Sequence, residues 1–190
     1  MKNVLFDLKQ HIDALLETGK QVIIAIDGNC TAGKTTLAAD LEREYDCNVF
    51  HMDDFFLRPE QRTPERYAQA GGNVDYERFY EEVLVPLKRG ETFSYRPFSC
   101  RTFTLSDAVT VLPKKLNVVE GTYSLHPYFG DVYDLKLFLS VDPQTQRERI
   151  SQRPQHVQPR FFTDWIPMEK LYFDTFCIPE QADLLLDRNA

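Results

Sequence analysis

The feature that most constrains this chain is an eight-residue pattern near its N-terminus, with glycines at the first and sixth positions and then lysine and threonine. The pattern reads Gly28-Asn29-Cys30-Thr31-Ala32-Gly33-Lys34-Thr35. It directly follows an apolar, strand-like run over 21–27 and opens a stretch of helical periodicity over 34–44. A GxxxxGK[ST] spacing between a strand and a helix predicts a phosphate-binding loop.

Each residue type in this loop has a chemical reason to be there. Glycines let backbone N–H groups point inward at phosphate oxygens, and the following helix N-terminus adds partial positive charge. Lys34 can neutralise the β- and γ-phosphates of a nucleoside triphosphate, and the Thr35 hydroxyl can bind Mg²⁺. We therefore expect ATP and Mg²⁺ as cofactors. The residues expected to contact the nucleotide are Gly28, Asn29, Cys30, Thr31, Ala32, Gly33, Lys34, Thr35 and Thr36.

Length and charge limit what else the chain can do. Its 190 residues predict one domain, here a kinase-type domain spanning the whole chain. The 22 Lys and Arg against 29 Asp and Glu give a net charge of −7, which argues against a broad electrostatic grip on nucleic acid or on an anionic membrane. An anionic ligand must therefore be held by a local group of positive charges.

The chain has no apolar stretch of membrane-spanning length and no leader pattern at its start, so we expect a cytoplasmic protein with no membrane partner. Its four cysteines, at 30, 47, 100 and 177, form no CxxC pair. We expect them to be reduced thiols, most of them packing residues.

Short β-branched runs alternate with amphipathic stretches, which indicates an α/β fold with a five-stranded parallel sheet flanked by helices, as in P-loop NTPases. Strands are expected over 21–27, 47–52, 117–120, 135–141 and 182–187, and helices over 4–18, 34–44, 75–88, 143–153 and 168–176. Gly19, Asp75 and Pro143 supply helix boundary signals. Two β-like runs within 93–112 predict a hairpin, part of an acceptor-binding insertion over about 58–112.

Acidic residues follow two of the expected strands. Asp53 and Asp54 come where the second strand ends, and Glu120 ends another. Because parallel strands bring their carboxyl ends to one edge of the sheet, all three can converge near the phosphates. One carboxylate would deprotonate an acceptor hydroxyl while another holds Mg²⁺. The alternatives are a turn or helix cap for the aspartate pair and a solvated strand end for Glu120.

A late arginine-rich stretch predicts a lid over about 143–160. Arg149 and Arg153 are four positions apart and would share a helix face. Guanidinium groups on a closing lid can stabilise a transferring phosphoryl group and exclude water. The alternative is a surface helix with salt bridges to Glu148.

These motifs resemble those of the uridine kinase and nicotinamide riboside kinase group within the phosphoribulokinase-like P-loop kinases. The similarity lies in Ile26-Asp27-Gly28, His51-Met52-Asp53-Asp54-Phe55-Phe56, Val119-Glu120-Gly121, the Arg149 and Arg153 pair, Gly71 to Phe79, Tyr95 and the segment Trp165 to Phe173. It runs from about residue 21 to residue 187.

The resemblance implies a role for each matching position. Asp53 would be the base toward the acceptor hydroxyl and would help to organise Mg²⁺, which Glu120 and Thr35 would also hold. Asp75 would bind ribose hydroxyls, and Tyr95 would pack against the nucleobase. The residues that would act in catalysis are Asp53, Lys34, Arg149 and Arg153.

The sequence also departs from that family. Ser99-Cys100-Arg101 aligns where uridine-cytidine kinases carry a pyrimidine-reading histidine, and Gln146 aligns with a lid arginine. Arg96 and Arg101 could therefore serve a different, even acidic, head group. Tyr123 and His126 could also line the acceptor pocket, although for His126 a place in a turn is the better expectation.

Taken together, the sequence predicts an ATP-dependent kinase that phosphorylates a hydroxyl of a small molecule, foremost the 5′-hydroxyl of a uridine-like nucleoside. The alternatives are a kinase for nicotinamide riboside, pantothenate or glycerate, a P-loop regulator that hydrolyses nucleotide slowly, and a non-catalytic binding module. Family analogy alone suggests a homo-oligomer. The sequence leaves open the phosphate donor and whether Asp53 or Asp54 is the base.

Overall fold

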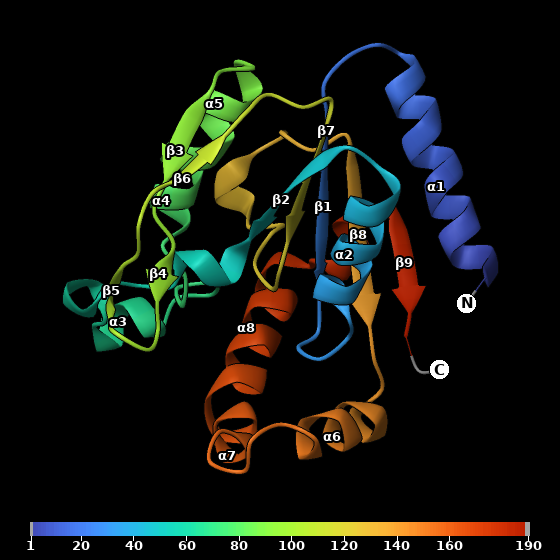
Figure 1. Ribbon diagram of the computed structural model, residues 1–190. Coiled ribbons are helices and arrows are strands. Elements are labelled where there is room, and N and C mark those ends of the chain that lie inside the picture. Colours follow the sequence, from blue (N-terminus) through green and yellow to red (C-terminus); the bar gives the residue numbers. More distant parts are fainter. Residues whose placement is uncertain (1, 189–190) are drawn as a thin grey trace.

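The computed structural model describes residues 2–188, of which 2–5 are described by their backbone alone. A parallel sheet of five strands forms its centre, in the order β2-β7-β1-β8-β9 (Figure 1). The strands are β1 (Val22–Gly28), β2 (Cys47–His51), β7 (Leu116–Glu120), β8 (Leu135–Ser140) and β9 (Leu184–Asp187). This order places β1, which leads into the phosphate loop, between β7 and β8.

The sheet is buried on both faces because β1 alternates apolar side chains between two hydrophobic clusters. Ile24 and Ile26 pack with α1 (Lys2–Glu17) and α2 (Lys34–Glu44) on one face. Ile23 and Ala25 pack on the other face with a larger, aromatic-rich cluster. This two-sided burial explains why the strand reads as a continuous apolar run.

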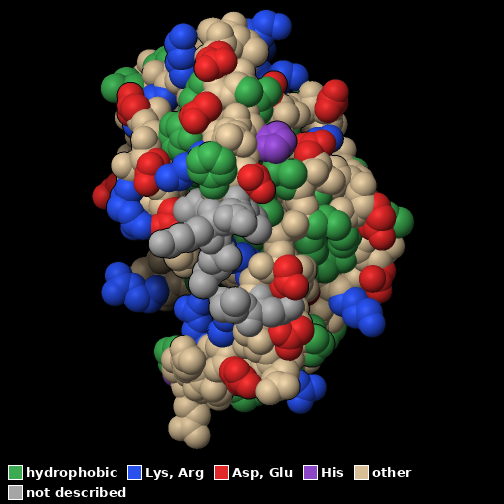
Figure 2. Space-filling model, turned by 90° about the vertical axis from the view of Figure 1, so that its right-hand side faces the viewer, with side chains coloured by type: hydrophobic (Ala, Val, Ile, Leu, Met, Phe, Trp, Pro, Cys, Tyr) green, Lys and Arg blue, Asp and Glu red, His purple; other side chains and the backbone are tan. Residues whose placement is uncertain are grey.

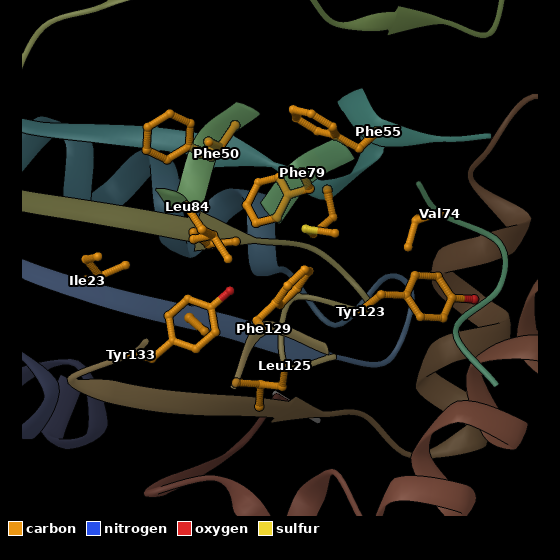
Figure 3. Packing of buried hydrophobic residues seen from close by; sticks show 14 of the residues in the cluster. Ile23, Phe50, Phe55, Val74, Phe79, Leu84, Tyr123, Leu125, Phe129 and Tyr133 are labelled. Atoms are coloured by element: carbon orange, nitrogen blue, oxygen red, sulfur yellow. The ribbon is translucent and has the colours of Figure 1, made fainter. Parts of the chain in front are cut away.

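The aromatic cluster is covered by helices from two distant parts of the chain. One is α4 (Tyr76–Phe79), which continues through a π-helical turn, η3 (Tyr80–Leu84), into α5 (Val85–Lys88); the other is α8 (Ile166–Phe176). Figure 3 shows the cluster, with Phe79, Leu84 and Phe129 close together. Phe129 comes from η4 (Pro127–Phe129), and its ring centroid lies 5.3 Å from that of Phe79.

The insertion is built from short elements rather than one hairpin. It holds η2 (Pro59–Gln61), α3 (Pro64–Tyr67) and two small antiparallel sheets, seen at the left of Figure 1. One sheet pairs β3 (Phe93–Tyr95) with β6 (Val109–Val111), and the other pairs β4 (Phe98–Ser99) with β5 (Thr104–Leu105). The predicted hairpin over 93–112 is thus split where Arg96 and Pro97 separate β3 from β4.

Several local predictions are confirmed. Helix α2 has the predicted bounds, Asp75 caps α4 by accepting the N–H of Arg78, and Pro143 opens α6 (Pro143–Ser151). The prediction that the helix continues to Arg153 is wrong. It ends at Ser151, because Pro154 cannot continue a helix and disfavours helical backbone in the residue before it.

The cysteines fit their prediction only partly. All four are free thiols, but Cys100 and Cys177 are exposed, so the expectation that most of them pack in the interior is wrong. Within residues 2–188, no helix has both the length and the apolar character to cross a membrane. On the side shown in Figure 2, acidic and basic side chains are interspersed rather than gathered into one patch.

Candidate active site

The predicted phosphate loop connects β1 to α2 at the carboxyl edge of the sheet. Its first residue must be glycine, because a Cβ at Gly28 would lie 2.1 Å from the carbonyl oxygen of Leu139 on β8. Thr31 has a positive φ of 63°, which disfavours a side chain, and its carbonyl accepts a hydrogen bond from Arg149. Thr36, predicted to contact the nucleotide, is exposed on the first turn of α2. The loop is therefore held from outside by β8 and by the predicted lid.

Lys34 folds back over the loop it follows. Its ammonium donates hydrogen bonds to the carbonyls of Gly28 at 2.7 Å and Asn29 at 2.8 Å, and to the Thr122 hydroxyl at 3.1 Å. Thr122 Oγ1 in turn donates to Gly28 at 3.0 Å. This arrangement keeps a buried positive charge at the loop, where phosphates would be bound.

Glu120, at the end of β7, joins three elements through one carboxylate oxygen. Its Oε1 accepts a hydrogen bond from Thr35 Oγ1 at 3.2 Å and lies 2.6 Å from Nδ1 of His51, the last residue of β2. The bond to Glu120 raises the pKa of His51. The predicted convergence of strand-end groups thus brings Thr35 and Glu120, two of the proposed Mg²⁺ ligands, into contact.

Asp53 and Asp54 lie in a 3₁₀ turn, η1 (Met52–Phe55), that continues β2. Gly121 lets this turn approach β7, because a Cβ there would lie 2.8 Å from that of Met52. Part of the Asp53 side chain is exposed, but surrounding protein atoms dehydrate its carboxyl. This dehydration, followed by the charge of Glu120, raises the pKa of the carboxyl. Asp54 accepts a 3.4 Å hydrogen bond from the Tyr95 hydroxyl. The two aspartates therefore differ, since Asp54 is held by a neighbour.

A fully buried aspartate secures the start of the phosphate loop. Asp27 accepts hydrogen bonds from the N–H groups of Gly28 and Leu125 at 2.7 and 2.9 Å and from the Tyr172 hydroxyl at 2.9 Å. A further N–H, from Tyr123, lies at 3.3 Å. Burial raises the pKa of Asp27 to about 6 in spite of these donors. Asp27 thus fixes the positions of β1, the turn after β7 and α8 relative to one another.

The predicted lid contacts the loop through only one of its two arginines. Arg149 on α6 donates to the carbonyls of Thr31 at 3.1 Å and Arg188 at 2.6 Å. Arg153 is exposed beyond the end of α6, so the prediction that the two share a helix face is wrong. The Arg188 guanidinium passes over the loop, 3.6 Å from the place of a Cβ on Gly33. The structure thus adds Arg188 to the groups that surround the phosphate loop.

On the acceptor side, Asp75 borders a hollow of about 420 Å³. Asp75 is 2% exposed, and its Oδ2 has no hydrogen-bond partner among the described residues. Two guanidinium nitrogens, Nε of Arg58 and Nε of Arg78, lie 3.7 and 3.6 Å from that oxygen. The hollow is lined by Arg58, Gln61, Asp75, Glu77, Arg78, Glu81, Glu82 and Leu105. Asp75 therefore has a buried carboxylate oxygen without a hydrogen bond from residues 2–188, between two guanidinium groups and beside a polar hollow.

Other predicted acceptor residues lie elsewhere or are already engaged. Tyr95 is buried and stacks on Phe55 at 5.4 Å between ring centroids, and Arg96 donates to the backbone carbonyls of Leu105 and Ser106. Arg101 is exposed in the turn between β4 and β5. Tyr123 belongs to the aromatic cluster. None of these four residues lines the hollow beside Asp75, and their proposed roles stay predictions.

The expectation that His126 occupies a turn agrees with its place in the structure. It caps η4 by accepting the N–H of Tyr128, and its ring stacks on Tyr76 with centroids 4.1 Å apart. It also lies parallel to the ring of Tyr172, with an interplanar angle of 3° and centroids 6.0 Å apart. His126 thus links α4, on the acceptor side, to α8.

Several residues at the site were assigned no role from the sequence. Two had a usable signal: Asp27 directly precedes the loop, and Thr122 follows Glu120 by two positions. Arg78 and Glu169 lie in segments that carry the family resemblance but received no role from it, and Arg188 had no signal in the sequence. Within residues 2–188, no group of three or more His, Cys, Asp or Glu could hold a metal by itself.

Comparison with known proteins supports the fold. No family model and no curated protein matches the sequence. Among solved structures, a possible uridine kinase from Bacillus stearothermophilus matches with a TM-score of 0.68 and 22% identity, over 95% of this chain and all of the other. The YGR205w protein matches with a TM-score of 0.63 and 15% identity, over 98% of this chain and 94% of the other.

The chain therefore has an α/β P-loop kinase fold, with a five-stranded parallel sheet flanked by helices. The predicted resemblance to uridine kinase-like proteins is confirmed for the fold.

Proposed function

We propose that this chain is an ATP-dependent kinase that transfers the γ-phosphoryl group to a hydroxyl of a small molecule, with the 5′-hydroxyl of a uridine-like nucleoside as acceptor. One observation carries the proposal: Lys34, the Thr35–Glu120 contact and Asp53 lie around one phosphate loop. A charged loop with a carboxylate beside it matches what phosphoryl transfer requires, namely charge stabilisation and an oriented hydroxyl.

In the proposed reaction, Asp53 accepts the proton of the acceptor hydroxyl. The hydroxyl oxygen then bonds to the γ-phosphorus while the bond from that phosphorus to the β–γ bridging oxygen breaks, which releases ADP. Lys34 exchanges its bonds to the Gly28 and Asn29 carbonyls for bonds to phosphate oxygens. The raised pKa of Asp53 makes it a stronger base than an ordinary aspartate.

The residues present suit Mg²⁺. The Thr35 hydroxyl, the Glu120 carboxylate and the Asp53 carboxylate are all hard oxygen donors, which this ion prefers. When bound, Mg²⁺ neutralises charge that develops on the phosphate oxygens. Thr35 and Glu120 would hold the ion from α2 and β7, and Asp53 would hold it from η1.

The acceptor is assigned to the hollow beside Asp75. Oδ2 of Asp75 has no hydrogen-bond partner in the described part of the chain and can accept a hydrogen bond from a ribose hydroxyl, and the guanidinium groups of Arg58 and Arg78 lie beside it. The fold likeness to a protein described as a possible uridine kinase supports a nucleoside, and the resemblance at Asp75 supports ribose.

An acceptor screen tests the proposal. The protein is incubated with Mg²⁺, ATP and each of a panel of nucleosides, nicotinamide riboside, pantothenate and glycerate, and products are detected by mass spectrometry. We expect a phosphorylated nucleoside, with uridine the best substrate. A product from only one of the other metabolites would retain the kinase but contradict the nucleoside assignment. Nucleotide binding without any phosphorylated product would instead favour a P-loop regulator or binding module.

A matched pair of variants tests the assignment of the base. Asp53→Asn should lower kcat by about 10²-fold or more, because the proton acceptor is lost. Asp54→Asn should cost less, because Tyr95 already occupies that carboxylate. Both changes remove one charge from the same turn, so the reverse ranking would make Asp54 the base.

A further inference from the structure

The phosphate loop is in contact with a buried carboxylate that the proposed reaction does not use. Glu169, on α8, is 3% exposed, which is unusual for a charged side chain and requires hydrogen-bond donors around it. In the sequence, Glu169 follows Lys34 by 135 positions. Its burial at the loop is therefore a product of tertiary structure.

The donors to Glu169 come largely from the loop itself. Oε2 accepts the backbone N–H of Cys30 at 2.8 Å, and Oε1 lies 3.5 Å from the side-chain amide nitrogen of Asn29. Gln146 on α6 donates to Oε1 at 3.2 Å and to the carbonyl of Cys30, also at 3.2 Å. Glu169 and Gln146 together therefore hold both the N–H and the carbonyl of Cys30, and we call these two side chains the loop clasp.

The clasp determines how the first half of the loop is oriented. Loop N–H groups bind phosphate only if the peptides before them are turned correctly, and free rotation there would have to be lost on binding. Burial, then the charge of Glu169, raises the pKa of the Cys30 thiol to about 12, so that side chain stays neutral. The clasp thus fixes the loop without adding a thiolate beside the triphosphate.

We propose that Glu169 is a positioning residue for the nucleotide, acting through the Cys30 peptide and supported by Gln146. This deepens the proposed function, because it assumes that the loop binds ATP. The acceptor site plays no part in it, so the effect should fall on the nucleotide alone. The essential property is the hydrogen-bond acceptor, since a negative charge at this place only repels phosphate.

Three variants separate the possible roles. Glu169→Ala removes the acceptor and should weaken Mg-ATP and ADP binding by about 10-fold or more, with a parallel rise in the KM for ATP and no change in the KM of the acceptor. Glu169→Gln keeps an acceptor oxygen for the Cys30 N–H but places an amide nitrogen where Oε1 faces Gln146, so it should lose clearly less nucleotide affinity than Glu169→Ala. Asp174→Ala removes one charge from an exposed position of the same helix and should change nothing.

Binding is measured by titration calorimetry, with melting curves to confirm that each variant folds. Equal affinity of Glu169→Ala and the original chain would overturn the inference, as would equal losses in the Ala and Gln variants. If Glu169→Ala does not fold, Gln146→Leu carries the test: about threefold weaker binding is expected, and unchanged affinity overturns the inference. Absence of nucleotide binding by the original chain would overturn both this inference and the proposed function.

Discussion

The two sides of the candidate site are built differently. The donor side comprises the phosphate loop and the strand-end groups Asp27, Glu120 and Thr122, and buried or part-buried hydrogen bonds hold it together. The acceptor side, residues 53–112, consists of 3₁₀ and π turns, short helices and two small sheets. The donor side depends on a regular sheet edge, whereas the acceptor side depends on individual side chains that bridge short elements.

The two sides therefore also differ in how far a local sequence pattern can predict them. The donor side uses backbone groups and a few residue types at fixed spacing, so a local pattern is enough to predict it. On the acceptor side, Arg78 does much of the bridging: it donates to the carbonyls of Asp54 and Arg96 and lies 4.2 Å from the ring centroid of Phe55. Under the proposed function, a different acceptor would involve these bridging side chains rather than the loop.

The largest effect is expected from a substitution of Lys34, the lysine of the phosphate loop on the donor side. Lys34→Met should lower turnover by about 10²- to 10³-fold, because it removes charge stabilisation from the transferring phosphoryl group, while the fold is retained. Initial rates at saturating ATP measure this effect. The exposed Lys170→Met is the control for loss of one positive charge. Turnover within tenfold of the original chain would show that phosphoryl transfer does not depend on the Lys34 ammonium.

A second test concerns the link between the two sides, where His126 stacks against Tyr76 and lies parallel to Tyr172. Burial lowers the pKa of His126 from 6.5 to about 4. Between these values the unfolded chain binds more protons at residue 126, so the contribution of His126 to the free energy of unfolding should fall by at most about 3 kcal/mol as the pH drops from 6.5 to 4. Asp27, whose pKa is raised to about 6, has the opposite effect over much of the same range.

Urea unfolding at a series of pH values measures this dependence. The contribution of His126 is the difference between the pH dependence of the original chain and that of His126→Phe, and the exposed control His156→Gln should leave the pH dependence unchanged. A pH dependence that is unchanged in His126→Phe would show that another group is responsible for the acid sensitivity.

The smallest expected effect separates the two sides most cleanly. Arg78→Met should raise the KM of the acceptor by about 10-fold and leave nucleotide affinity unchanged, because this guanidinium organises η1 and the hollow. Steady-state kinetics and ATP titration measure the two quantities separately. Arg89→Met, at an exposed position past the end of α5, is the matched control. Equal losses in both quantities would mean that the two sides are not independent.

How far the sequence predicts the structure follows the same division. The five strands, the bounds of α2, the cap at Asp75 and the helix start at Pro143 were predictable because burial and capping leave patterns over a few neighbouring residues. The position of Glu120 near the phosphate loop, where it contacts Thr35, was predictable because the carboxyl ends of parallel strands share an edge. Topology alone thus gives the outline of the donor side.

The rest depends on contacts that no local pattern records. The bond from Glu169 to Cys30 spans 139 positions, and the pairing of Tyr95 with Asp54 spans 41. Arg96 carries a charge suited to ligand binding, yet its guanidinium donates hydrogen bonds to the backbone carbonyls of Leu105 and Ser106. The residue types indicate which groups these side chains are able to bind, but their actual partners depend on the tertiary structure.

The buried carboxylate of Asp27 has a consequence for how the protein is made. Its partners Tyr123, Leu125 and Tyr172 follow it by 96, 98 and 145 positions. During synthesis from the N-terminus, the whole phosphate loop leaves the ribosome long before the helix that secures its first residue. A nascent chain that ends before Tyr172 has the complete loop sequence but not the anchored loop. Nucleotide-binding competence should therefore arise late in translation, after α8 has emerged and packed against the sheet.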